Sequence, residues 1–143
     1  MCHTIIAENK KDKNGEEYVS YNASSPDELA LVNGARHLGF GFIDRDEDGK
    51  MVCTTRFGER RYKLLNLIEF DSTRKRMSVI VRTPEGHIKC ICKGADSIIE
   101  KRLKEKGKIL KKTQKYLDGY AKLGLRTLLI ASKDVDEEFY EKW

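Results

Sequence analysis

The middle of the chain contains four or five predicted β-strands that follow one another with only short turns between them. Asp48-Gly49 is a hairpin signal, and Pro84-Glu85-Gly86 is a second turn signal between two apolar runs. Strands joined by such short connections pair with their neighbours in antiparallel orientation. The expected strands cover residues 40–45, 51–57, 61–70, 77–83 and 87–93. Any fold that accommodates this segment must therefore contain an antiparallel sheet.

The first helix has the clearest start in the sequence. Ser25 is a favourable N-cap, Pro26 suits the first helical position, and Glu28 follows the cap by three residues, which is the spacing of a capping box. The helix is expected to run to about Leu38 and to end at Gly39. A charged hairpin tip or surface loop at residues 9–17 precedes it.

Further elements surround this central segment. Val79, Ile80 and Val81 are consecutively apolar, which predicts a central strand covered on both faces. The remaining expected elements are a strand at residues 18–23, helices at 94–103 and 109–123, a strand at 125–132 and a last helix from Asp136. Together these predictions give one α+β domain over residues 1–143, an antiparallel β-sheet of about six strands flanked by helices.

Composition limits the class of protein. Charged residues make up 36% of the chain, apolar residues 39%, and the net charge is +5, which favours anionic partners such as a nucleotide, a nucleic acid or an anionic lipid surface. Four cysteines with no C-x-x-C spacing predict free thiols in a reducing compartment and no metal site. No apolar run is long enough to span a membrane, and the chain stops inside a helical pattern, so we expect an excised piece of a longer protein.

One aromatic residue precedes a cationic loop. Phe70 ends a predicted strand and is followed by Ser72-Thr73-Arg74-Lys75-Arg76 within the next six positions. As an ordinary core residue, Phe70 would bury its ring. Alternatively, an aromatic face beside cations can stack on a flat heterocycle and attract its phosphates, and such stacking contributes about 1–3 kcal/mol per base.

Four separate segments of the chain carry a family resemblance. They read F-D-S-T-R-K-R-M-S-V-I-V at residues 70–81, S-P-D-E at 25–28, K-G-A-D at 93–96 and G-L-R-T-L at 124–128. In this order they resemble the nucleotide-binding (N) domain of a P-type ATPase, and the wording R-K-R-M-S-V-I-V resembles the type-four branch, the phospholipid flippases. The resemblance covers nearly the whole chain.

The resemblance implies a nucleotide-binding site. It assigns Phe70 to stacking on adenine and Glu28 to the adenine end of the pocket, where a carboxylate can accept a hydrogen bond from the exocyclic amine. The residues alone leave Glu28 open between this role and the capping box with Ser25.

The same resemblance assigns cations to the site. Lys93 would lie in the nucleotide pocket, next to a glycine that permits close approach of a ligand. Arg126, at the start of a predicted strand, would reach the phosphates, which its forked donors match. Lys75 and Ser72 are further candidates, and Asp96 is expected to cap a helix rather than contact the nucleotide.

The implied activity belongs to a longer parent protein. The chain lacks the phosphorylated D-K-T-G-T motif, a T-G-E-type loop and the G-D-G-x-N-D magnesium site of the family. We therefore expect a soluble, cytosolic-facing ATP-binding domain that is inactive alone, with Mg²⁺ bound outside it. Its expected partners are ATP, the other cytosolic and membrane domains of the same integral membrane protein and an accessory transmembrane subunit.

Two other functions stay open from the sequence. A non-enzymatic basic module would bind RNA or an anionic membrane surface through residues 74–76 and 101–112. Only Phe70 qualifies as an aromatic residue interleaved with cations, so nucleic acid is not an expected partner. A docking domain that has lost its affinity for nucleotides is the third class.

Overall fold

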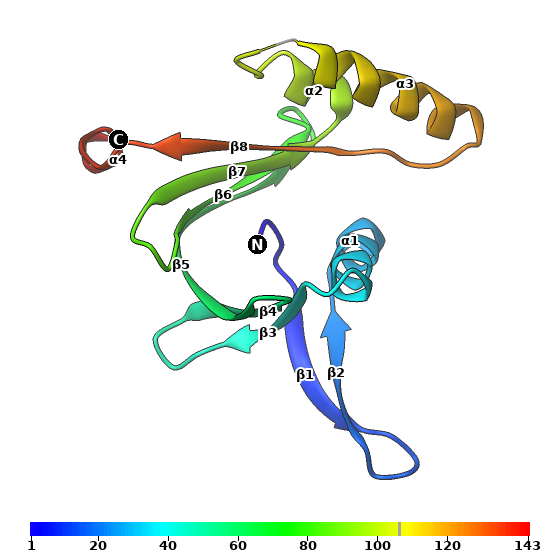
Figure 1. The fold of residues 1–143 in the computed structure, drawn as a ribbon, viewed down its shortest axis with the longest axis vertical. Helices are drawn as coiled ribbons and strands as arrows, with labels where there is room; N and C mark the ends of the chain where they lie inside the picture. The colour runs from blue at the N-terminus through cyan, green and yellow to red at the C-terminus, as the bar shows by residue number, and fades with distance from the viewer. Residues whose placement is uncertain (106) are drawn as a thin grey trace.

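The computed structural model describes residues 1–105 and 107–143, which form two antiparallel sheets and the helices around them (Figure 1). The larger sheet has six strands in the order β3-β4-β5-β6-β7-β8. These strands are β3 (Gly41–Arg45), β4 (Lys50–Thr55), β5 (Gly58–Asp71), β6 (Arg76–Arg82), β7 (Ile88–Gly94) and β8 (Leu129–Val135). The helices are α1 (Pro26–His37), α2 (Asp96–Glu100), α3 (Lys108–Lys122) and α4 (Glu137–Lys142). The predicted α+β fold, with six antiparallel strands flanked by helices, is confirmed.

The small sheet was only half predicted. Its strands are β1 (Ile6–Lys11) and β2 (Glu17–Asn22), which pair from Ile6 opposite Asn22 to Lys11 opposite Glu17. The hairpin tip at Gly15 lies where the sequence placed it. Strand β1 was expected to be loop from residue 9 onward, because its charged, mostly exposed residues lack the alternation of a half-buried strand.

The large sheet curls around the N-terminal segment of the chain. In Figure 1, β5 bends between the β3–β4 hairpin and the layer of β6, β7 and β8, and residues 1–5 run through the concave side. Ile5 packs with Val32, Phe42 and Met51 in one core cluster, and Met1 contacts both that cluster and the second one, formed by residues 77, 79 and 81 of β6. Residues 79–81 are all buried, as predicted for a central strand.

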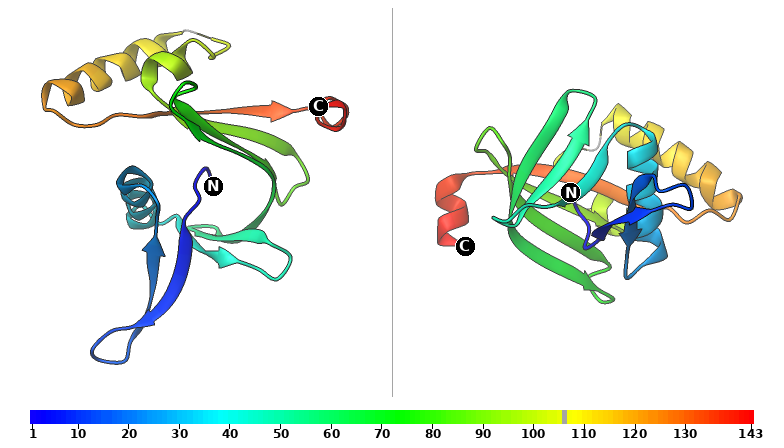
Figure 2. Two further views of the ribbon diagram at one scale, coloured as in Figure 1. Left: turned by 180° about the vertical axis from the view of Figure 1, so that it is seen from behind. Right: turned by 90° about the horizontal axis from the view of Figure 1, so that it is seen from below.

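The helices lie around this curved layer, and α1 lies beside the N-terminal segment (Figure 1). Figures 1 and 2 show α2 and α3 beyond β8, and the β1–β2 hairpin projecting at the opposite end. Helix α3 buries Leu117, whereas its periodic residues Ile109, Tyr116 and Tyr120 stay exposed. None of the helices in the described part of the chain has the length and hydropathy that a membrane span needs. Of the basic region at 101–112, residue 106 lies outside the described residues.

Of the two predicted helix caps, Ser25 is the N-cap of α1 without the predicted hydrogen bonds, and Asp96 is not a cap. Ser25 and Pro26 do start α1, but the Ser25 side chain makes no capping hydrogen bond, and the Glu28 carboxylate bonds elsewhere. Asp96 is the first residue of α2 rather than its cap, which is Ala95, and the Asp96 carboxylate accepts the Ser97 N–H instead. The predicted helix ends are correct, since Gly39 and Gly124 have positive φ angles of 88° and 72° just after α1 and α3.

His3 is buried beside the core and makes stability depend on pH. Its side chain is 4% exposed, its ring packs edge-on against Phe42, and its Nδ1 accepts the Ile5 N–H. Burial lowers the pKa of His3 from 6.5 to about 3. Below pH 6.5 the His3 imidazole therefore binds a proton in the unfolded chain, whereas in the folded chain it stays neutral until the pH approaches about 3.

We expect acid to destabilise the protein through His3. The free energy of unfolding should fall by about 1.4 kcal/mol for each pH unit below the ordinary histidine pKa, until the folded-state pKa is reached. Urea unfolding at pH 7.0, 6.0 and 5.0 measures this slope. In His3→Gln the slope between these pH values should be shallower, and an equal slope in both proteins would rule out His3 as its source.

Candidate functional site

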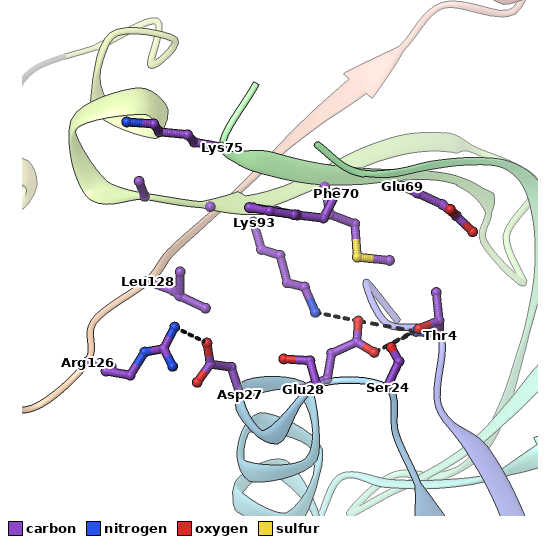
Figure 3. Close-up of a pocket in the computed structure, with 14 residues that line it drawn as sticks. Thr4, Ser24, Asp27, Glu28, Glu69, Phe70, Lys75, Lys93, Arg126 and Leu128 are labelled. Atoms are coloured by element: carbon purple, nitrogen blue, oxygen red, sulfur yellow. Dashed lines mark hydrogen bonds and ion pairs between the residues drawn. The ribbon is translucent and has the colours of Figure 1, made fainter. Parts of the chain in front are cut away.

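A cavity of about 900 Å³ lies between the ends of strands β5, β6 and β7 and the start of α1 (Figure 3). Its volume is within the range of small-molecule sites, about 300–1,000 Å³. Five of the six predicted site residues line it: Glu28, Phe70, Lys75, Lys93 and Arg126. Ser72, in the turn after β5, is not among its lining residues.

Phe70 points away from the core because the strand that carries it is irregular. In β5, Ile68 pairs with Ser78 and Asp71 pairs with Arg76, so Glu69 and Phe70 together face the single residue between those partners in β6. Such a bulge re-aims side chains at a strand end. The Phe70 side chain is 64% exposed at the edge of the cavity. Its ring therefore has a face that a planar ligand can cover.

Glu28 and Lys93 form an ion pair inside the cavity wall. Glu28 comes from the first turn of α1 and Lys93 from β7, and Lys93 Nζ lies 2.7 Å from Glu28 Oε1 (Figure 3). The two side chains are only 7% and 10% exposed. Because each of these buried charges is paired, neither carries the cost of an isolated buried ion.

Thr4 completes the hydrogen bonding of Glu28. The Thr4 hydroxyl donates to Glu28 Oε2 at 2.9 Å, and the Thr4 N–H donates to the same oxygen at 3.2 Å. Burial acts to raise the pKa of Glu28, but the hydrogen bonds from Lys93 and Thr4 outweigh it, and the pKa is lowered from its ordinary value. Glu28 is therefore a fixed anion at the floor of the cavity.

The basic loop after β5 is held by its own backbone contacts. Asp71 accepts hydrogen bonds from the Thr73 and Arg74 N–H groups, each at 2.9 Å. Lys75 adopts a positive φ of 52° and its carbonyl accepts the Ala95 N–H at 3.1 Å. This conformation brings Lys75 to the cavity, while the guanidinium groups of Arg74 and Arg76 bond to carbonyl oxygens of the loop region.

Gly94 lines the cavity, and the fold itself requires a glycine at this position. A Cβ at this position would lie 2.5 Å from the Lys75 carbonyl oxygen and 2.7 Å from Arg76 Cβ. The sequence prediction explained the glycine by close approach of a ligand, and the structure adds a second reason, the close approach of the basic loop. Gly94 thus fixes the distance between the loop and the end of β7.

Gly94→Ala should destabilise the domain by about 1–3 kcal/mol, because the added methyl group overlaps backbone atoms and forces the basic loop away from β7. Thermal unfolding followed by circular dichroism measures the change. Gly34→Ala in α1 is the matched control, since a Cβ there meets no atom within 4 Å and alanine favours a helix. Equal melting temperatures for Gly94→Ala and the unchanged protein would contradict the close packing.

Arg126 lies across the cavity entrance from Lys75 (Figure 3). It is not part of a strand, contrary to the prediction, because β8 begins at Leu129, which pairs with Gly94, the last residue of β7. Arg126 Nη2 lies 3.0 Å from Asp27 Oδ2, and the Arg126 side chain is 82% exposed. The guanidinium can therefore exchange this solvated carboxylate for another anion at little cost.

The sequence reasoning missed several residues of the cavity wall. Asp27 and Glu69 adjoin predicted site residues, so proximity along the chain was the available signal. Met77 and Leu128 lie inside two of the segments that carry the resemblance but were not singled out as site residues, and Thr4 comes from another segment and gave no local signal. These residues add an apolar wall and one hydroxyl to the charged groups.

The arrangement is that of a binding site. An exposed ring, a buried ion pair and two further cations surround one hollow, which suits a planar heterocycle that carries an anionic group. In residues 1–105 and 107–143, no three His, Cys, Asp or Glu side chains are grouped as a metal ion would require.

Comparisons with known proteins agree with this geometry. Residues 1–142 match the protein family described as P-type ATPase, cytoplasmic domain N. The chain is 48% identical over 145 residues to the phospholipid-transporting ATPase ID of Homo sapiens, an alignment that covers 100% of this chain and 12% of the human protein. It is 46% identical over 144 residues to the phospholipid-transporting ATPase DRS2 of Saccharomyces cerevisiae, covering 99% of this chain and 10% of the yeast protein. The chain thus spans about a tenth of the length of these relatives.

Proposed function

The chain belongs to the family of P-type ATPase cytoplasmic N domains, and from that premise we propose that it holds ATP in the cavity beside Phe70 as the nucleotide-binding domain of a longer phospholipid-transporting ATPase. Membership of this family implies ATP binding. The observation that carries the proposal for this cavity is the convergence of Phe70, Lys75, Lys93 and Arg126 on one hollow.

The proposed binding mode follows the chemistry of the wall. Adenine stacks on the exposed ring of Phe70, and its exocyclic amine donates to the carboxylate of Glu28. Lys75 and Arg126 stand on either side of the entrance and attract the phosphates. Lys93 neutralises Glu28 and keeps the adenine end of the pocket from repelling the phosphates electrostatically.

The role in the parent protein is part of the same proposal. The domain would present the γ-phosphate to an aspartate in another domain, and positioning and electrostatics would carry most of the catalysis. Phosphorylation would then drive movement of a phospholipid across the membrane that holds the parent. The domain alone does not hydrolyse ATP by this route. A Mg²⁺ site outside this chain and an accessory transmembrane subunit rest on the family resemblance alone.

A two-dimensional NMR titration of the domain with ATP tests the proposal. Because the domains that would close over the phosphates are separate, we expect a dissociation constant of about 0.1–10 mM, or about −3 to −5 kcal/mol. The shifts should cluster at Glu28, Phe70, Lys93 and Arg126, and Mg²⁺ should change them little. Indifference to ATP together with steep, salt-dependent binding to RNA or anionic vesicles would instead favour a basic binding module.

A further inference from the structure

Thr4 contacts the buried anion of the site from a segment that carries no recognised motif. It precedes β1 and lines the cavity beside Glu28, 24 positions away along the chain (Figure 3). Both its hydroxyl and its N–H donate to the Glu28 carboxylate, at 2.9 Å and 3.2 Å to Oε2. Thr4 therefore donates hydrogen bonds from two of its groups to one side chain of another element.

The two oxygens of Glu28 have different partners. Oε1 accepts from Lys93 Nζ at 2.7 Å, and Oε2 accepts from the Thr4 hydroxyl. The Thr4 N–H is shared between both oxygens, at 3.3 Å to Oε1 and 3.2 Å to Oε2. The terminal torsion angle of a glutamate has a broad, weakly restricted distribution. With Lys93 as the only partner, the carboxylate could therefore rotate about this torsion. With Thr4 on the other oxygen, the plane of the carboxylate is fixed.

We propose that Thr4 is a positioning residue that fixes the Glu28 carboxylate so that the pocket selects adenine over guanine. This inference rests on the proposed function, because it needs a purine at Phe70. At the position where adenine carries an amino group, which donates, guanine carries a carbonyl oxygen, which accepts. A carboxylate held in one orientation can accept a hydrogen bond from the first and repels the second. A carboxylate that can turn away discriminates less between them.

The test compares ATP and GTP binding to the domain carrying Thr4→Val and Thr4→Ser. Valine keeps the shape and the N–H but removes the hydroxyl, and serine keeps the hydroxyl. Thr4→Val should lower the ratio of ATP affinity to GTP affinity by about three- to tenfold, the order of the net contribution of one hydrogen bond. Thr4→Ser should keep the ratio within about twofold of the unchanged protein. An unchanged ratio in Thr4→Val would overturn the inference.

Phe70→Ala separates this inference from the function on which it rests. Loss of the stacking ring should weaken the binding of ATP and of GTP alike, so that the shifts caused by both nucleotides almost disappear. If neither nucleotide binds the unchanged domain, the proposed function fails. If ATP binds through Phe70 but Thr4→Val leaves the ratio unaltered, only the role of Thr4 fails.

A second measurement reads the state of Glu28 directly and needs no nucleotide. The pKa of the Glu28 carboxyl group can be read from its side-chain ¹³C shift in the unchanged domain, where Lys93, His3 and Asp27 are the charged or titratable groups around it. It should lie below the ordinary value of 4.5. In Thr4→Val it should rise and in Thr4→Ser stay low, which shows whether the Thr4 hydroxyl bonds to the carboxylate in solution, while the ratio of ATP affinity to GTP affinity shows whether that bond matters for selectivity. A Glu28 pKa at or above 4.5 in the unchanged domain would overturn the inference.

Discussion

Phe70→Ala is expected to weaken ATP binding by about ten- to a hundredfold, because one stacked base contributes about 1–3 kcal/mol. The ring is 64% exposed and lies outside both core clusters, so its removal should leave the fold intact. NMR titration gives the dissociation constant, and the spectrum without nucleotide shows in the same experiment whether the domain is folded. At the low affinity of an isolated domain, a loss of this size means that ATP shifts almost disappear.

Phe57→Ala is the matched control for this substitution. Phe57 is also a highly exposed phenylalanine beside an arginine, but it lies in the turn after β4 and does not line the cavity. Its removal should leave the ATP affinity unchanged. If both substitutions weakened ATP binding equally, or if neither weakened it, adenine would not be stacked on Phe70.

Lys93→Met should destabilise the domain by about 3–5 kcal/mol, because it leaves the charge of Glu28 buried without its partner. Both side chains are at most 10% exposed, so water cannot replace the lost ammonium group easily. Urea unfolding measures the loss. The same substitution should also weaken ATP binding, since the uncompensated carboxylate would repel the phosphates.

Two further variants identify the cause of that loss. Adding Glu28→Gln to Lys93→Met removes the orphaned charge and should recover most of the lost stability. Lys89 lies on β7, the same strand as Lys93, and pairs with Asp134 of β8, where both side chains are exposed. Lys89→Met breaks this pair and should change the stability little. A double variant as unstable as Lys93→Met alone would show that packing of the lysine, rather than charge pairing, stabilises this wall.

Much of the fold was predictable because its signals are local. Short turns at glycine, consecutive apolar residues in β6 and glycines after α1 and α3 each act within a few residues of the chain. The site residues Glu28, Phe70, Lys93 and Arg126 were predicted from a family resemblance across four segments, and the structure brings them to one cavity. The residues alone left Phe70 open between a buried core position and a stacking surface beside the cationic loop.

The remaining features depend on contacts between distant segments. The bulge that turns Phe70 outward is set by the pairing of β5 with β6, and Thr4 meets Glu28 only because the sheet curls around the N-terminal segment. The capping prediction for Glu28 failed because Lys93, 65 residues away, offers a buried charge that Ser25 cannot match. Arg126 was placed in a strand because the local sequence does not show that pairing with β7 begins only at Leu129, opposite Gly94.

The central claim is that ATP binds with its adenine on the ring of Phe70. Intermolecular nuclear Overhauser effects between the adenine protons of ATP and the aromatic protons of Phe70 test it directly. We predict cross-peaks from the adenine H2 and H8 protons to Phe70 in the unchanged domain, and their absence in Phe70→Ala. Cross-peaks from adenine to the exposed tyrosines of α3, with none to Phe70, would contradict the account.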